Sequence, residues 1–549
     1  MPHDYKAHFP FPDIRPEQHA AIEFALDAFL DKGKRFVILQ MGTGCGKSAM
    51  AVAVAQYLAS RLDKVVGMDG EEHTGAYVLT TQKILQEQYM NDFGAPRKNL
   101  MVTIKSSANY QCQFYKDQSC AESRRVISRL RKQLQGTDFL KTCQGNCCYS
   151  LDKQKFIESP LGVTNFSYFL AETMYAKKLG PRALLIIDEC HNTENELGRF
   201  IEVTFSERFA RDILKCKVPG LKDQEAVFNW IRTSYKSKLA KHIKELEKAI
   251  ESKLDSESEG LHELTKQYEM LDKHICKVNR FITAYDASNW IMNTIRPNDG
   301  DRRRARKFEF KSIDVSKYSH DMLFQFGCRV LMMSATVIDK NIFCKSVGID
   351  PTEAEFLSIP SPFPIENRLV HYVPAGSMSM KNIDTTLPVM VEVVKLLISQ
   401  HPNEKGIIHA VNYKVAQYLH DHIKDERLLI HTTNTRDVVM QMHLTSKEPT
   451  ILLSPSMMEG VDLADDASRF QILCKVPFPY LGDDLIRKRM ERNKEWYTYQ
   501  TVKSVIQAFG RSIRNETDHA ISYIIDEDWG RFYQMNKKMF PEEFSNALT

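Results

Sequence analysis

The chain has 549 residues, of which 43% are hydrophobic and 26% are charged, and its formal net charge is +4. This length exceeds one ordinary hydrophobic core and predicts roughly three or four structural units, while the composition excludes a disordered chain. The small net charge excludes a uniformly basic chain, so a surface that binds nucleic acid must be a local patch.

The sequence shows neither an export signal nor a membrane span. Its start has no basic segment followed by an apolar run, and no later stretch approaches about 18 uninterrupted apolar residues. We therefore expect a cytoplasmic protein, or a nuclear one in a eukaryote, with no membrane partner, and we expect a monomer.

Apolar runs that end at polar or glycine-rich segments recur along the first part of the chain, and helix-like stretches separate them. They lie at 35–44, 76–82, 183–191 and 329–336. A second set follows residue 365, at 405–412, 450–460, 470–479 and 521–528. Such alternation predicts two parallel α/β units in tandem.

The first apolar run leads into a glycine-rich segment that precedes a helix-like stretch, which is the context of a phosphate-binding loop. Lys47 is expected to reach the outer phosphates of ATP, and Ser48 can ligate Mg²⁺. Glycines let backbone N–H groups approach the phosphates at a helix N-terminus. The strict pattern has glycine where Met41 stands, so a glycine-rich turn without nucleotide is the alternative. The expected ATP-binding residues are Met41, Gly42, Thr43, Gly44, Cys45, Gly46, Lys47 and Ser48.

Five of the twelve cysteines fall between Cys112 and Cys148. Disulfides are rare inside cells, so this clustering indicates a bound metal. Thiolate ligands suit both a zinc ion and an iron–sulfur cluster, so ligand type leaves both open.

Asp188 and Glu189 end the third apolar run, and two buried acids side by side require a reason. With Lys47 on a nearby strand, Asp188 can hold magnesium while Glu189 orients and deprotonates the attacking water. An acidic strand end without function is the alternative for this motif alone. The two motifs in this order predict an ATPase.

Residues 199–306 are charged and favour helix, with few strand signals. The apolar spacing is not sustained over several heptads, so we expect a packed helical insertion and not a coiled coil. A basic run ends it, and contact with phosphate and a solvated surface are equally expected for this run. Its residues are Arg302, Arg303, Arg304, Arg306 and Lys307.

Three later motifs complete the pattern: Ser334–Thr336, 458–462 and 507–514. The last contains Arg511 and Arg514, one helical turn apart, which can both face a phosphate, although a solvated helix is the alternative. In this order the set resembles a superfamily 2 helicase. Three features narrow the resemblance to the XPD/DinG family: the cysteine cluster, the helical insertion and the segment 361–368, S-P-F-P-I-E-N-R. The resemblance extends from about residue 15 to residue 526.

The resemblance implies two tandem RecA-like parallel-sheet motor domains. The first would comprise 1–105, 150–200 and 310–364, interrupted by an iron–sulfur insert at 106–149 and a helical arch at 201–309. The second would comprise 365–549. By the same resemblance, Gln507, Arg511 and Arg514 join Lys47, Asp188 and Glu189 in catalysis, and Arg15, Gln18, Gly460 and Asp462 contact the nucleotide, Gln18 at its adenine.

The resemblance also implies a [4Fe–4S] cluster on Cys112, Cys120, Cys143 and Cys147. The family's last ligand is typically followed by Pro-Tyr, and placing Cys147 there puts Cys148 in the proline position and Tyr149 on the tyrosine. Cys148 is therefore not expected to bind iron.

The expected function is an ATP-dependent DNA helicase or translocase that acts on single-stranded and forked DNA, moves 5′ to 3′ and uses ATP, Mg²⁺ and the cluster. A partner protein could load it onto DNA. The alternatives are a translocase that strips proteins or remodels RNA without unwinding, and a non-catalytic nucleotide-binding scaffold.

Overall fold

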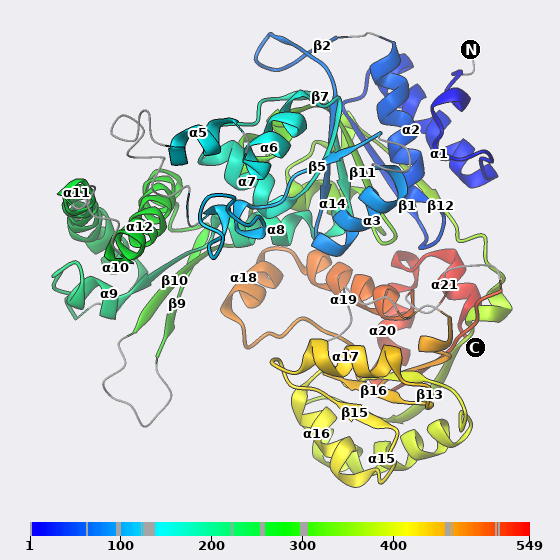
Figure 1. Cartoon of the computed structure of the whole chain (residues 1–549). Helices are drawn as coiled ribbons and strands as arrows, with labels where there is room; N and C mark the ends of the chain where they lie inside the picture. Colours follow the sequence, from blue (N-terminus) through cyan, green and yellow to red (C-terminus); the bar gives the residue numbers. More distant parts are fainter. Residues whose placement is uncertain are drawn as a thin grey trace.

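The computed structural model contains two α/β units, each built around a parallel sheet (Figure 1). It describes residues 3–61, 64–94, 100–121, 123, 138–145, 147–220, 223–252, 259–296, 306–455, 463, 465–510, 513 and 517–549. The predicted fold class of two tandem parallel-sheet units is confirmed.

The first unit has a seven-stranded sheet in the order β12-β1-β11-β7-β4-β6-β5, and all its strand pairs are parallel. Its strands are β1 (Phe36–Met41), β4 (Ala76–Thr80), β5 (Val102–Thr103), β6 (Leu161–Asn165), β7 (Arg182–Asp188), β11 (Gly327–Ser334) and β12 (Ala354–Ile359). Along β1 the side chains alternate between two buried clusters, with Val37 and Leu39 in one and Phe36 and Ile38 in the other. Both faces are therefore covered, which explains the continuous apolar runs of the sequence.

Helices cover both faces of this sheet (Figure 1). They are α1 (Pro16–Leu26), α2 (Lys47–Ser60), α3 (Lys83–Phe93), α6 (Cys148–Glu158), α7 (Phe166–Met174), α8 (Thr193–Ile201), α13 (Ser316–Met322) and α14 (Lys340–Val347). A two-stranded antiparallel hairpin, β2 (Val65–Val66) with β3 (Glu72–His73), lies at the periphery, and α5 (Asp138–Gly145) belongs to the cysteine-rich segment.

The segment between α8 and α13 contains the expected helices and also an antiparallel sheet in the order β8-β10-β9. Its elements are β8 (Val203–Ser206), α9 (Glu207–Asp212), α10 (Gln224–Trp230), α11 (Lys236–Ser252), α12 (Glu259–Ala284), β9 (Trp290–Ile295) and β10 (Lys307–Ser312). The expectation of a purely helical insertion was incomplete. Strand β10 alternates exposed and buried side chains, which is the short period-2 signal of a strand with one covered face.

The second unit has a six-stranded parallel sheet in the order β13-β18-β17-β14-β16-β15. Its strands are β13 (Val370–Gly376), β14 (Gly406–His409), β15 (Leu428–Ile430), β16 (Ile451–Ser454), β17 (Phe470–Leu473) and β18 (Ile521–Asp526). Its helices are α15 (Ile383–Ser399), α16 (Tyr413–His422), α17 (Arg436–Thr445), α18 (Asp484–Arg492), α19 (Lys494–Phe509), α20 (Asp528–Asn536) and α21 (Glu542–Ala547).

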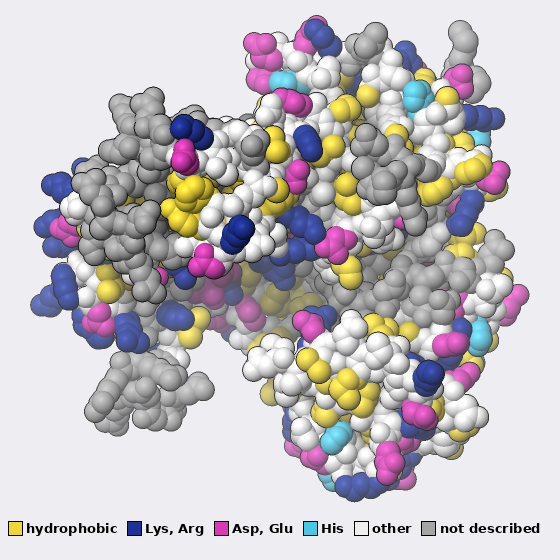
Figure 2. All heavy atoms as spheres, viewed as in Figure 1, with side chains coloured by type: hydrophobic (Ala, Val, Ile, Leu, Met, Phe, Trp, Pro, Cys, Tyr) yellow, Lys and Arg dark blue, Asp and Glu magenta, His cyan; other side chains and the backbone are white. Residues whose placement is uncertain are grey.

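Helices α18 and α19 lie between the two sheets in Figure 1, so they connect the second unit to the first. Figure 2 shows a hollow between the part that carries α11 and α12 and the second unit, with Lys and Arg side chains gathered at its upper rim. Within the described ranges, no helix is long and apolar enough to span a bilayer.

Candidate nucleotide site

A tight loop, 42–46, connects β1 to α2 at the carboxyl edge of the first sheet. Gly44 and Gly46 have φ angles of 81° and 76°, in the left-handed region where a side chain is strained. A Cβ atom at Gly46 would also displace the Gln18 amide, but it is the turn that requires glycine. The Lys47 ammonium is folded into the loop, where it donates to the carbonyl oxygens of Met41 and Gly42, both at 3.2 Å.

Arg15 and Gln18 hold this loop from the first turn of α1. The Arg15 guanidinium donates to the Gly44 carbonyl at 2.9 Å, and the Gln18 amide donates to the Cys45 carbonyl at 3.1 Å. The Gln18 side-chain oxygen accepts from the Arg15 backbone N–H at 3.0 Å. Both ends of the Gln18 amide thus make contacts within the protein, and its proposed contact with adenine stays a prediction.

Asp188 stands at the carboxyl end of β7, with β11 between β7 and the loop-bearing β1. It accepts hydrogen bonds from the Tyr89 hydroxyl and from the Glu189 backbone N–H, both at 2.9 Å. Burial and the neighbouring Glu189 charge raise the pKa of Asp188 to about 6, against the attraction of Lys47. Tyr89 also contacts the Ser48 hydroxyl, so it brings the two oxygens expected at magnesium to one place. This hard-oxygen donor set fits Mg²⁺.

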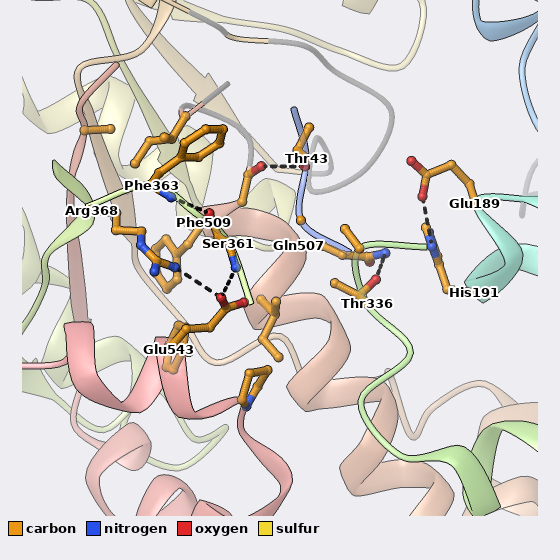
Figure 3. Close-up of a pocket in the computed structure, with 18 of the residues that line it drawn as sticks. Thr43, Glu189, His191, Thr336, Ser361, Phe363, Arg368, Gln507, Phe509 and Glu543 are labelled. Atoms are coloured by element: carbon orange, nitrogen blue, oxygen red, sulfur yellow. Dashed lines mark hydrogen bonds and ion pairs between the residues drawn. The ribbon is translucent and has the colours of Figure 1, made fainter. Parts of the chain in front are cut away.

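A chain of polar contacts leads from Glu189 into the second unit (Figure 3). The Glu189 carboxylate lies 3.3 Å from His191 Nδ1, which lies 2.7 Å from the Ser334 hydroxyl. The Ser334 oxygen accepts from the Thr336 backbone N–H at 3.0 Å. The Thr336 hydroxyl accepts from the Gln507 amide of α19 at 3.1 Å. Sequence reasoning included Ser334–Thr336 as one motif of the pattern but did not select His191, whose only signal was its position next to the two acids.

Gln507 is the predicted site residue of the second unit that the structure places in the cleft. Its side chain is buried, and its Oε1 has no hydrogen-bond partner among the described residues. The Thr43 hydroxyl donates to the Gly510 carbonyl at 3.4 Å, so the loop also contacts the end of α19. The remaining predicted residues Arg511, Arg514, Gly460 and Asp462 lie outside the described residues.

Two residues of the loop, Gly42 and Thr43, line one cavity of about 400 Å³ together with Glu189 and the end of α19. Its wall runs from Glu189 and His191, past Gly42, Thr43 and Gln507, to a group of residues to which the sequence analysis assigned no role. These are Phe363, Arg368, Phe509, Glu543 and Phe544.

The predicted thiol ligands Cys112, Cys120, Cys143 and Cys147 are all buried, whereas Cys148 is exposed. The sulfur atoms of Cys120 and Cys147 are 3.8 Å apart, and Cys112 and Cys143 pack together with Phe139. Burial opposes ionisation of Cys147, but hydrogen bonds from Ser150, Cys120 and Tyr149 bring the pKa of its thiol below the ordinary value. A buried thiol that ionises readily fits a soft metal or an iron–sulfur group.

Of the basic run, Arg302, Arg303 and Arg304 lie outside the described residues. Arg306 makes two contacts of 3.1 Å with the Glu207 carboxylate and is therefore engaged within the protein. Contact of this run with phosphate stays a prediction.

Two family models match the chain: "Helicase C-terminal domain" over residues 403–547, and "Type III restriction enzyme, res subunit" over 12–216. The ATP-dependent DNA helicase YoaA of Haemophilus influenzae is 20% identical over 90% of this chain and 88% of that protein. A regulator of telomere elongation helicase 1 homolog of Caenorhabditis briggsae is 28% identical, but the match covers 17% of this chain and only 10% of that protein.

Two solved structures share the fold of almost the whole chain. One, titled "XPD_Helicase", has a TM-score of 0.62 and 14% identity over 98% of this chain and all of that one. The other, an Xpd4 of S. tokodaii, has a TM-score of 0.56 and 13% identity over 97% and 99%. This chain is thus similar to a helicase C-terminal domain in its second unit and to one ATP-dependent DNA helicase over most of its length, and it shares the fold of the XPD structures.

Proposed function

We propose that this protein is an ATP-dependent DNA helicase that moves along single-stranded DNA and unwinds duplexes. The observation that carries the proposal is the chain of contacts from Glu189 to Gln507, because it joins a hydrolysis site on one unit to a helix of the other.

In this proposal the loop N–H groups and Lys47 bind the phosphates of ATP. Lys47 must leave the carbonyl oxygens of Met41 and Gly42 to reach them. Ser48 and Asp188 would hold Mg²⁺, which supplies positive charge to the phosphates. Glu189 orients and deprotonates the attacking water, and His191 keeps its carboxylate in place.

Gln507, on α19 of the second unit, would couple this site to the second unit. Its Oε1 is buried without a hydrogen-bond partner among the described residues, while its amide holds Thr336. Loss of the outer phosphate would change these contacts and allow the two units to shift, which converts hydrolysis into movement. Arg511 and Arg514 would add positive charge from the same segment.

DNA would lie in the hollow between the α11–α12 part and the second unit, where Lys and Arg side chains gather (Figure 2). Cys112, Cys120, Cys143 and Cys147 would hold a [4Fe–4S] cluster in the insert at 106–149. Movement 5′ to 3′ is part of the proposal and rests on the family resemblance alone.

The test uses forked DNA with either a 5′ or a 3′ single-stranded tail. We expect DNA to stimulate ATP hydrolysis, and we expect unwinding of the fork with the 5′ tail. Stimulated hydrolysis without unwinding of DNA or RNA forks would identify a stripping translocase. Absence of hydrolysis with intact ATP binding would identify a scaffold and refute the proposal.

A further inference from the structure

Beyond Gly42 and Thr43 the cavity continues into a second compartment, which we call the aromatic chamber and define by Phe363, Arg368, Phe509, Glu543 and Phe544. Three separate segments build it: the connection between β12 and β13, the end of α19, and α21. In Figure 3 the chamber residues lie at one end of the cavity and Glu189 at the other, with Thr43 and Gln507 between them. Nothing in the hydrolysis mechanism uses this compartment.

The chamber presents flat apolar surfaces. The rings of Phe509 and Phe544 are nearly parallel, with centroids 6.2 Å apart and an interplanar angle of 23°. Phe363 packs on Ile513 and Ala520 on another wall. Among the further lining residues, Ala520, Ser522 and Ala547 are small, whereas Val370, Ile506 and Pro541 add apolar surface. Such walls suit a planar aromatic group.

The chamber also carries polar groups at its border with the phosphate loop. The Glu543 carboxylate accepts from the Ser361 backbone N–H at 2.6 Å and lies 3.7 Å from the Arg368 guanidinium. The Arg368 Nε is buried without a hydrogen-bond partner among the described residues. A Cβ atom on Gly42 would lie 3.4 Å from the Ser361 Cβ, so this polar border touches the start of the loop.

We propose that the aromatic chamber binds the nucleoside half of the nucleotide whose phosphates lie on the loop. This inference rests on the proposed ATPase function and adds to it the residues that recognise the base. The base would lie against Phe363, Phe509 and Phe544. The Glu543 carboxylate, which only accepts, would receive a hydrogen bond from a nucleoside donor, either the adenine amine or a ribose hydroxyl.

Gln18 is the competing recognition residue. Its amide nitrogen and oxygen already contact Cys45 and Arg15, so it fixes the shape of the loop. The chamber, in contrast, has open volume and aromatic walls and begins at the same loop. Geometry therefore favours the chamber for the base.

The first experiment compares ATP with inorganic tripolyphosphate, which has phosphates but no nucleoside. We expect Phe363→Ala and Phe544→Ala each to raise KM for ATP about fivefold or more, with kcat nearly unchanged, because stacking on a base is lost. The inhibition constant of tripolyphosphate should not change. Phe11→Ala, at a ring that is 44% exposed and outside the cavity, is the matched control and should leave both values unchanged.

The second experiment uses Glu543→Gln and Arg368→Lys, which keep side-chain size and guard against misfolding of the Phe variants. KM is measured for ATP, for ITP, which lacks the amine, and for dATP, which lacks the 2′-hydroxyl. If Glu543→Gln raises KM for ATP but not for ITP, Glu543 contacts the adenine amine. If it raises KM for ATP but not for dATP, Glu543 contacts the ribose 2′-hydroxyl. Equal loss with all three assigns it to the remaining ribose hydroxyl.

Lys47→Ala and Gln18→Ala complete the set. If Lys47→Ala abolishes tripolyphosphate binding while the chamber variants leave KM for every nucleotide unchanged, the chamber inference is wrong and the phosphate site stands. If Gln18→Ala raises KM for ATP while the chamber variants do not, the chamber inference is also wrong. If the wild type binds neither ATP nor tripolyphosphate, the proposed function fails first.

Discussion

Arg489 and Glu194 form a buried ion pair, with an N–O distance of 2.9 Å, that joins α18 of the second unit to α8 of the first. The Trp496 indole N–H donates to the same carboxylate at 3.0 Å. Because Gln507, near the other end of α19, contacts Thr336, this helix is anchored to the first unit near both of its ends. Helix α8 begins at Thr193, shortly after Glu189, so the anchor lies near the proposed hydrolysis site in the sequence.

Removal of Arg489 should destabilise this junction strongly. Arg489→Ala leaves the Glu194 carboxylate buried without its charge partner, and such losses cost about 3–5 kcal/mol. Urea unfolding measures the change. Arg487→Ala is the control, because Arg487 is exposed and pairs only with Asp484 and Glu491 at the surface, where we expect less than about 1 kcal/mol. Equal effects of the two variants would show that the pair does not hold the units together.

The contact between Gln507 and Thr336 should couple hydrolysis to the second unit. Thr336→Val and Gln507→Ala should each lower DNA-stimulated kcat by about tenfold, roughly the worth of one hydrogen bond. The double variant should be no slower than the slower single variant, because both remove the same contact. Thr501→Val, which loses a hydroxyl bonded within α19, is the matched control. Fully additive losses would contradict the coupling.

Substitutions of Lys47 and Glu189 should impair different steps, ATP binding and ATP hydrolysis respectively. Lys47→Ala should weaken binding of ATP, whereas Glu189→Gln should bind ATP with near-normal affinity and hydrolyse it on the order of 10²–10⁴ times more slowly. Equilibrium binding of a fluorescent ATP analogue and steady-state hydrolysis separate the two. Near-normal turnover by Glu189→Gln would remove Glu189 from the role of general base.

Cys147 and Cys148 should differ although they are adjacent. Cys147 is buried 3.8 Å from Cys120, whereas Cys148 is exposed and its sulfur accepts from the Gln113 amide. We expect Cys147→Ser to lose iron and the absorbance near roughly 400 nm, and Cys148→Ser to keep both, in protein purified without air. DNA unwinding should fail before basal ATP hydrolysis does. The reverse result would show that Cys148, and not Cys147, binds the cluster. Stoichiometric zinc without iron would rule out the cluster.

Affinity for single-stranded DNA should fall steeply with salt. A chain of net charge +4 must gather its Lys and Arg into a local groove, and single strands give a log–log slope of about −0.7 for each phosphate contact. We expect a slope steeper than about −2, measured by anisotropy with an oligo-dT that cannot pair. Sucrose at matched osmolarity is the control and should leave the affinity unchanged. A flat dependence would argue against the groove.

The sequence by itself determined the local chemistry of this protein. The loop at 41–48 and the acids at 188–189 are contiguous, and each follows an apolar run that could only be a buried strand. Since the carboxyl ends of parallel strands meet at one edge of a sheet, the pattern predicted that Lys47, Asp188 and Glu189 lie at the same edge. The parallel α/β architecture was predictable for the same reason.

Tertiary structure alone decided which distant residues share the site. Ser361 and Glu543 form a hydrogen bond although they are 182 positions apart, and nothing in the motif that begins at Ser361 connects it to Glu543. His191 meets Ser334 only because β7 and β11 are neighbours, and strand order is not encoded in the period of an apolar run. The aromatic chamber depends on how α19 and α21 pack beside the first sheet, which is set by burial of side chains across the whole interface.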